Sequence, residues 1–182
     1  TEVYMQLKPG ESIIIKTFIH PVEAEEWIYF EPTGEVMALN RDWTLNFTDS
    51  DPAVSETFNI DTLSSWTDIG PDVLKINMGT GVYRKTFAFK KNPGSEYLLS
   101  LGDVRERALV KINGRDAGTL YAVPFETKIG DLLQDGENSI EIAVTNLPAN
   151  RIADYDKKGV EWRIFHEINF VSITYQPTKF DI

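Results

Sequence analysis

The stretch Ala-Leu-Val-Lys-Ile-Asn-Gly-Arg-Asp-Ala-Gly-Thr-Leu, residues 108–120, carries the clearest structural signal in the chain. Two runs with the composition of β-strands flank the pair Asn113-Gly114. A two-residue hairpin turn of type I′ needs positive φ at both central residues, and Asn and Gly tolerate that conformation best. The stretch therefore predicts a β-hairpin.

Alternation of apolar and polar side chains extends this prediction along the chain. Residues 43–47, 83–89 and 139–145 all alternate in this way. A period of two places one face of a strand in a core and the other toward water. Residues 48–81 are less regular, and we expect them to wrap the core as a surface segment. Further strands are expected at residues 13–18, 27–30, 97–101, 125–129, 160–165 and 169–175.

The length of 182 residues fits one domain. About eight short strands separated by turn residues, with no long stretch of helical period, favour an all-β fold. We expect an antiparallel β-sandwich of the jelly-roll type, formed as a single domain by residues 1–182. In this prediction residues 1–62 supply N-terminal strands and residues 63–175 form the main part of the core.

Composition excludes several classes of function. The chain has 18 Lys and Arg against 28 Asp and Glu, a net charge of -10. Nucleic acid and anionic membrane surfaces are therefore unfavourable partners, because both need a basic surface. The absence of cysteine excludes thiol nucleophiles and Cys-ligated metals. No apolar run reaches the roughly 18 residues of a membrane span.

The spacing of several motifs resembles a known family of domains. The segments that carry the resemblance are 83–87, 99–106, 110–120, 124–125, 131–133, 136–138 and 144–147, with 63–67, 150–151 and 154–162 beside them. Together they resemble the sugar-binding, galactose-binding-domain-like jelly roll of glycoside hydrolase family 2. They are more similar still to the accessory sandwich of large bacterial α-L-rhamnosidase-type hydrolases.

The resemblance implies a function outside catalysis. Such modules sit beside a separate catalytic domain in the same polypeptide, so the expected partners are carbohydrate and that domain. The implied location is secreted, periplasmic or cell-surface in a bacterium. No catalytic barrel is present in these 182 residues, so hydrolase activity does not carry over and we expect the chain itself not to be an enzyme. The motif residues specify turns and strands, and a fold by itself does not give a function.

Aromatic side chains suggest how a sugar would be held. A pyranose presents an apolar C–H face that stacks on an exposed aromatic ring, beside hydrogen-bonding groups. Trp43 lies in a clean alternation and is expected in the core, whereas Trp66, Tyr121 and Tyr155 are the better stacking candidates. The residues predicted to contact sugar, at the loops that flank the strand 139–145, are Tyr121, Arg151, Asp154, Tyr155 and Trp162.

Two other functions compete with an accessory module. An independent lectin-like protein would fit a mature N-terminus made by signal cleavage, since the chain begins at Thr1. A small glycosidase would need two carboxylates facing each other across a cleft. The acids available for such a pair are Asp131, Asp135, Asp154, Asp156, Glu161 and Glu167. The two histidines, His20 and His166, are expected to be structural or on the surface.

No cofactor and no metal ligand set is predicted. Residues 154–161 faintly resemble a calcium loop, but the spacing is not that of an EF-hand and two lysines lie within the stretch. We expect a polar loop between strands there. A structural calcium ion, held elsewhere by Asp side chains and backbone carbonyls, stays open.

Overall fold

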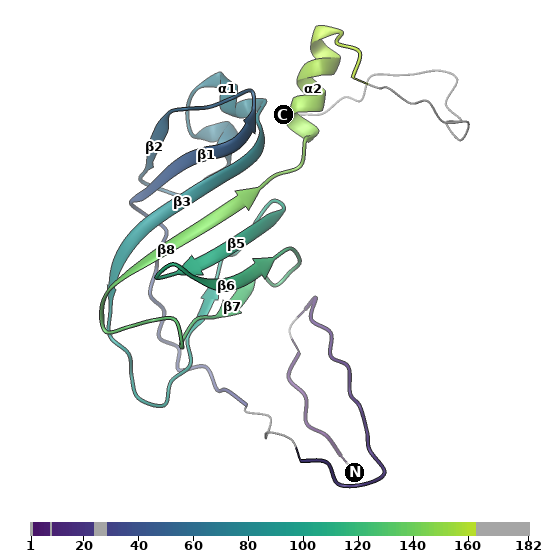
Figure 1. Ribbon diagram of the computed structural model, residues 1–182, viewed down its shortest axis with the longest axis vertical. Coiled ribbons are helices and arrows are strands. Elements are labelled where there is room, and N and C mark those ends of the chain that lie inside the picture. The colour runs from purple at the N-terminus through teal and green to yellow at the C-terminus, as the bar shows by residue number, and fades with distance from the viewer. Residues whose placement is uncertain (1, 8, 24–28, 163–182) are drawn as a thin grey trace.

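A computed structural model describes residues 2–7, 9–23 and 29–162 of the chain (Figure 1). Its main sheet has six strands in the order β2-β1-β3-β8-β5-β6, and β4 and β7 form a second, two-stranded sheet. The strands are β1 (Trp43–Asp51), β2 (Thr57–Ile60), β3 (Met78–Phe89), β4 (Leu98–Ser100), β5 (Arg107–Ile112), β6 (Arg115–Leu120), β7 (Glu126–Lys128) and β8 (Gly136–Thr145). The helical segments are η1 (Trp66–Asp68), α1 (Asp72–Lys75) and α2 (Ala149–Lys158).

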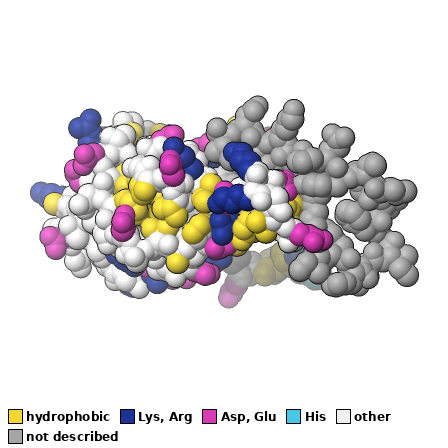
Figure 2. Space-filling view, turned by 90° about the horizontal axis from the view of Figure 1, so that it is seen from above, with side chains coloured by type: hydrophobic (Ala, Val, Ile, Leu, Met, Phe, Trp, Pro, Cys, Tyr) yellow, Lys and Arg dark blue, Asp and Glu magenta, His cyan; other side chains and the backbone are white. Residues whose placement is uncertain are grey.

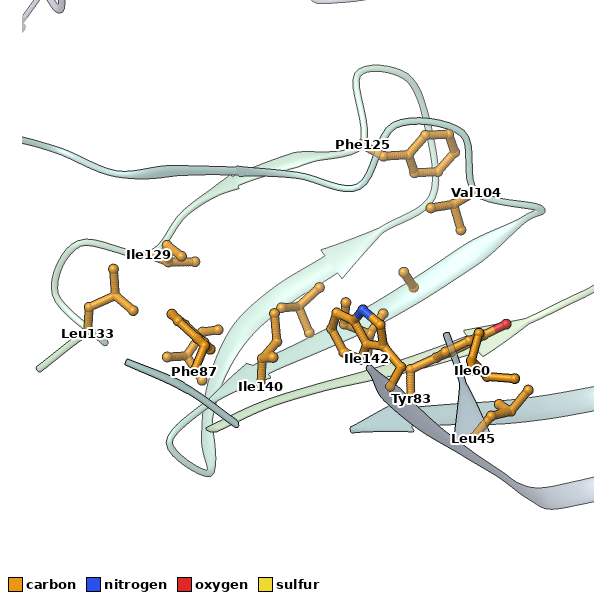
Figure 3. Close-up of a cluster of buried hydrophobic side chains, with 14 residues drawn as sticks. Leu45, Ile60, Tyr83, Phe87, Val104, Phe125, Ile129, Leu133, Ile140 and Ile142 are labelled. Atoms are coloured by element: carbon orange, nitrogen blue, oxygen red, sulfur yellow. The ribbon is translucent and has the colours of Figure 1, made fainter. Parts of the chain in front are cut away.

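Every strand pair is antiparallel, and the hydrophobic core lies between two layers. In Figure 3, Val104, Phe125 and Ile129 lie on one side of the cluster and the side chains of the main sheet on the other. The prediction of an all-β antiparallel sandwich is confirmed. The finer prediction, a galactose-binding-domain-like jelly roll, stays a prediction. The buried core residues are Trp43, Leu45, Ile60, Tyr83, Phe87, Val104, Ala108, Val110, Ile112, Phe125, Ile129, Leu133, Ile140 and Ile142.

The predicted hairpin is present, and its turn is anchored to the rest of the sheet. Asn113 and Gly114 have φ of 52° and 74°, the positive values that a type I′ turn requires. The Asn113 amide donates to the Leu132 carbonyl at 2.9 Å and to Oδ1 of buried Asn138 at 2.8 Å. Asn113 Oδ1 accepts the backbone N–H of Ser139 at 2.9 Å. These bonds fix the β5–β6 hairpin to the start of β8.

Trp66 packs against the sheet, so its predicted role as an exposed stacking platform is wrong. Its ring meets Phe47 edge-on with centroids 4.9 Å apart, and its Nε1 donates to the Tyr83 hydroxyl at 2.7 Å. A Cβ on Gly81 would lie 2.7 Å from the Trp66 ring, so this close approach requires glycine. Trp43, 3% exposed, lies in the core as predicted.

Two predicted segments differ from the structure. Residues 13–18 form no strand, and Ile14 in this segment is 96% exposed. A strand needs a second strand to pair with, and the composition of a segment does not show whether one is present. Residues 48–81 do more than wrap the core, since they contain the end of β1, all of β2, η1 and α1, and the start of β3.

Helix α2 occupies the segment for which a polar loop was predicted. Asp and Asn compete with helical backbone bonds, so the composition of residues 149–158 conceals the helix. Its C-terminal signals are conventional: Lys157 and Lys158 lie in the last turn, and Gly159 has φ of 66° at the C-cap. None of the described helices is long and apolar enough to cross a membrane.

Several predictions fall wholly or partly outside the described residues. Val160–Trp162 form no strand, and the rest of the strand predicted at 160–165 lies beyond them. The strand predicted at 169–175, with His166 and Glu167, also lies outside the described part. Residues 27 and 28 of the strand predicted at 27–30 lie outside it as well, and Tyr29 and Phe30 form no strand.

The core predicts a large effect of truncating Leu45, which is 0% exposed in β1. We expect Leu45→Ala to lower the free energy of unfolding by about 2–5 kcal/mol, because the lost transfer energy adds to the cost of a cavity. Leu98→Ala is the matched control, since Leu98 is 51% exposed, and we expect a change of at most about 0.5 kcal/mol. Urea denaturation measures both, and equal losses would contradict this description of the core.

Candidate functional site

The ends of β1, β3 and β8 meet where helix α2 begins. Asn146, directly after β8, accepts the backbone N–H of Gly79 at Oδ1 (2.9 Å) and donates from Nδ2 to the Asn77 carbonyl (3.0 Å). Gly79 has φ of 144°, and a Cβ there would lie 1.8 Å from the Asp49 carbonyl oxygen, so only glycine fits. This packing fixes where α2 leaves the sheet.

An ionic cluster joins α2 to the end of β1, and we call Asp51, Arg151, Asp154, Tyr155 and Lys158 the Asp51–Arg151 cluster. Arg151 donates to Asp51 through both Nε (2.9 Å) and Nη2 (3.0 Å), the two-pronged geometry that suits guanidinium and carboxylate. Nη1 of Arg151 donates to Asp154 at 3.1 Å, and Lys158 donates to the same oxygen at 2.8 Å. The Tyr155 hydroxyl donates to Asp51 at 3.0 Å, under the Arg151 guanidinium.

Charge and hydrogen bonding set the ionisation of this cluster. The hydrogen bond from Arg151 lowers the pKa of Asp51, more than partial desolvation raises it, and the Tyr155 hydroxyl adds to the lowering. Asp51 in turn raises the pKa of Arg151. Asp51 is therefore a carboxylate at neutral pH, which suits an ion pair and not proton donation.

The structure brings together three of the five predicted sugar-contact residues: Arg151, Asp154 and Tyr155. Trp162 lies near the same helix, and its Nε1 donates to Asp156 at 2.7 Å. Tyr121 follows β6 at the same end of the sheet, because the register pairs Leu120 with Ala108 and Ala108 with Val144. Its ring is 78% exposed, and within the described residues no hydrogen bond joins it to the cluster.

The sequence alone did not indicate that Asp51 and Lys158 belong to the cluster around Arg151. Asp51 is 100 positions from Arg151, and only the strand order shows that β1 ends beside α2. Lys158 lies one turn after Asp154 on α2, a spacing that would have indicated the pair had the helix been predicted. In Figure 2, this end of the molecule shows basic and acidic side chains next to hydrophobic ones.

The described surface includes two depressions that bear on binding. One, of about 320 Å³, lies beside the cluster and is lined by Asp49, Ser50, Asp51, Met78, Gly79, Asn146 and Pro148. The other, of about 570 Å³, lies on the face of the main sheet opposite the core, and we call it the outer-face depression. Its lining residues are Asp42, Thr44, Arg84, Lys85, Thr86, Lys111, Gly114, Ser139, Ile140 and Glu141.

A row of charges crosses the outer-face depression. The register places Arg84 of β3 and Lys111 of β5 on either side of Glu141 of β8. Arg84 donates through Nε at 2.7 Å, and the Lys111 ammonium lies 3.5 Å from the other carboxylate oxygen. In the described part of the chain the terminal nitrogens of Arg84 have no partner, so the row has donors left for a ligand.

The described residues contain no group of three or more His, Cys, Asp or Glu side chains placed to hold a metal. Asp154, in the segment that resembles a calcium loop, lies on a helix and pairs with two cations. A structural calcium ion bound elsewhere in the chain stays a prediction.

Comparisons with known proteins connect this fold to glycoside hydrolases. No family model matches the chain. A "Putative beta-glucuronidase" of Formosa agariphila is 33% identical over 127 residues, which are 64% of this chain and 11% of that protein. The chain thus spans about a tenth of the length of this curated relative.

Solved structures of similar proteins are also matched by this chain over only a small part of their length. A rhamnosidase from Novosphingobium sp. PP1Y matches 84% of this chain and 14% of its own, with a TM-score of 0.63 and 24% identity. An FMN-binding beta-glucuronidase from Facaelibacterium prausnitzii L2-6 matches 62% of this chain and 18% of its own, with a TM-score of 0.51 and 27% identity. The chain therefore corresponds to a small part of these enzymes.

The cluster predicts a pH-dependent role for Asp51. Because its pKa is lowered on folding, its stabilising contribution is complete above about pH 4, the usual carboxyl pKa, and is lost as pH falls through the lower folded value. We expect Asp51→Asn to lower the melting temperature at pH 7 by about 2 °C, and the difference from the wild type to shrink as the pH falls below about 4.

Thermal unfolding followed by circular dichroism between pH 2.5 and 7 measures this difference. Asp61→Asn is the matched control, because Asp61 is exposed and no ion pair involves it in the described part of the chain. A difference between Asp51→Asn and the wild type that stays constant with pH would show that the ion pair is not its cause.

Proposed function

We propose that the chain is an accessory domain of a longer glycoside hydrolase, whose catalytic residues lie outside these 182 residues. The observation that carries the proposal is that this chain matches only a small part of each similar protein. It covers 11% of the putative beta-glucuronidase, 14% of the rhamnosidase and 18% of the FMN-binding beta-glucuronidase. The domain would contribute by packing against the catalytic part and by binding carbohydrate. A secreted, periplasmic or cell-surface location in a bacterium belongs to the same proposal.

The chemistry of the carboxylates supports a role outside catalysis. A glycosidase needs one carboxyl group that stays protonated as a general acid, facing a second carboxylate. The pKa of Asp51 is lowered, and Asp154 is held between Arg151 and Lys158. Asp135 accepts the backbone N–H of Lys91 at 2.7 Å, and Asp156 accepts from Trp162. All four acids make hydrogen bonds or ion pairs within the chain, and the proposal gives them a structural role.

Carbohydrate binding has two candidate surfaces. The predicted set around Arg151 has most of its polar atoms engaged inside the chain, which leaves Tyr121 as its most exposed member. The outer-face depression has the volume of a ligand site, with donors on Arg84 and Lys111 and acceptors on Glu141. That composition suits a polar ligand rich in hydroxyl groups, such as an oligosaccharide.

The size of the native polypeptide tests the accessory role. Peptide mapping of the protein purified from its source cells locates residues 39–158 in a chain of measured mass. We expect a mass well above the 20.7 kDa of this chain, together with glycosidase activity. An independent protein of about 20.7 kDa would contradict the proposal and favour the lectin-like alternative.

The catalytic prediction is tested on the 182-residue chain itself. We expect no hydrolysis of aryl β-D-glucuronide or aryl α-L-rhamnoside above the buffer rate, because the proposal assigns the catalytic carboxylate pair to a domain outside these 182 residues. Release of the chromogenic aryl group measures this. Hydrolysis that disappears on changing one carboxylate to its amide would instead establish the small-glycosidase alternative.

A calorimetric titration with galactose-, rhamnose- and glucuronate-containing oligosaccharides tests sugar binding. We expect saturable binding that Arg84→Gln weakens about tenfold, since a hydrogen bond to a charged group contributes roughly 1.5–3 kcal/mol. Tyr121→Ala separates the two surfaces, because it would weaken binding only if sugar lies at the α2 end of the sheet. A flat titration across the panel would leave packing against a catalytic domain as the whole function.

A further inference from the structure

The N-terminal part of the chain lies beside the sandwich, and its described residues form none of the strands (Figure 1). We call residues 2–7 and 9–23 the N-terminal arm, and Figure 1 shows it as two extended limbs joined by a turn, beside the lower half of the molecule. The body begins near Leu39, whose carbonyl accepts Nε1 of Trp43 at 2.5 Å. The neighbouring carbonyl of Asn40 accepts the backbone N–H of Leu63 at 3.3 Å.

Apolar exposure is concentrated in and just after this arm. Ile14 is 96% exposed and Ile19 97% exposed, which is unusual for large aliphatic side chains. The exposed large hydrophobic residues before position 38 are Val3, Tyr4, Met5, Leu7, Ile13, Ile14, Ile15, Phe18, Ile19, Val22, Tyr29, Phe30, Val36 and Met37. The remainder of the described chain adds Leu63, Leu98, Tyr121, Val123, Leu147 and Val160.

In the described part of the chain, the arm contacts Tyr29 and the loop after β6. Tyr29 donates from its hydroxyl to the Tyr4 carbonyl at 2.6 Å, and the two rings meet edge-on at 5.2 Å. The turn at Gly10 approaches Val123 in the loop after β6. Neither limb belongs to a strand pair within the described residues. The apolar side chains of residues 13–19 are therefore left largely to solvent.

The composition of the arm is that of a buried strand. Residues 13–18, Ile-Ile-Ile-Lys-Thr-Phe, are almost all β-branched or aromatic, the residues that sheets favour. Burying an aliphatic side chain of this size is worth about 1.5–3 kcal/mol, so leaving several in water is unfavourable. An extended apolar segment with unpaired N–H and C=O groups is a template for pairing with another strand.

We propose that the N-terminal arm completes a β-sheet of a neighbouring domain in the same, longer polypeptide. The inference rests on the proposed function, because the relatives are matched over only 11% to 18% of their lengths and the rest of such a polypeptide would supply the sheet. A second copy of this chain is the less favourable partner, since each copy carries a net charge of -10 and two would repel each other. The arm thus ties the accessory domain to its neighbour.

Hydrogen–deuterium exchange read by mass spectrometry tests the proposal. Peptides that cover residues 11–19 are compared in the 182-residue chain and in the longer polypeptide that contains it. In the chain alone we expect exchange within seconds. In the longer polypeptide we expect exchange at least about 100-fold slower, since paired strand amides open only through local unfolding. Equally fast exchange in both would overturn the proposal.

Substitutions in the longer polypeptide make the test specific. Ile14→Asn and Ile19→Asn together should restore fast exchange in residues 11–19 and leave β8 peptides protected. Leu147→Asn is the matched control, because Leu147 is 56% exposed outside the arm and should change nothing in residues 11–19. Equal protection in the double variant and the wild type would also overturn the proposal.

Three further outcomes distinguish failure of the arm proposal from failure of the proposed function. Concentration-dependent protection of residues 11–19 in the isolated chain, with a dimer in sedimentation velocity, would identify a second copy as the partner and overturn the interdomain proposal. A native protein of only 182 residues would overturn the proposed function, and with it this inference. A longer native protein with an unprotected arm would overturn this inference alone.

Discussion

Ten consecutive residue pairs between β3 and β8 hold the two halves of the main sheet together. β1 and β2 attach to the outer side of β3, and β5 and β6 attach to the outer side of β8. The inward-facing residues of this central pair, including Tyr83, Phe87, Ile140 and Ile142, contribute to the buried core. Removing this pairing would separate the two attached strand pairs, so the rest of the sandwich depends on it.

The same pairing positions both candidate surfaces. On the outer face it sets Arg84 opposite Glu141, with Lys111 of β5 on the other side. At the strand ends it brings Thr80 beside Thr145, and from there the chain enters α2. Arg151 of α2 then reaches Asp51 at the end of β1. The cluster is thus a consequence of strand order, and its main effect is to fix α2 against the sheet.

The sequence predicted what depends on local patterns. Alternation placed strands at residues 43–47, 83–89 and 139–145, and Asn113-Gly114 predicted the hairpin, because both signals act between near neighbours. Helix α2 was missed, since its Asp and Asn residues mask a helix that tertiary contacts stabilise.

Long-range relations explain the remaining differences. The Asp51–Arg151 pair joins positions 100 residues apart, so only the topology shows it. Of the predicted sugar-contact residues, Arg151, Asp154 and Tyr155 lie together because they are neighbours on α2, and their contact with sugar stays a prediction. The local context gave no sign that hydrogen bonds within the chain already engage their polar atoms. The strand predicted at 13–18 has suitable composition but pairs with no other described segment, which is why composition alone misplaced it.

An experimental structure of the longer polypeptide, bound to a substrate analogue, tests the central claim most directly. We predict that residues 43–158 keep this sandwich and that the catalytic carboxylates come from another domain. We also predict that the N-terminal arm lies in a neighbouring sheet. A substrate analogue held between two carboxylates of residues 43–158 would contradict the account.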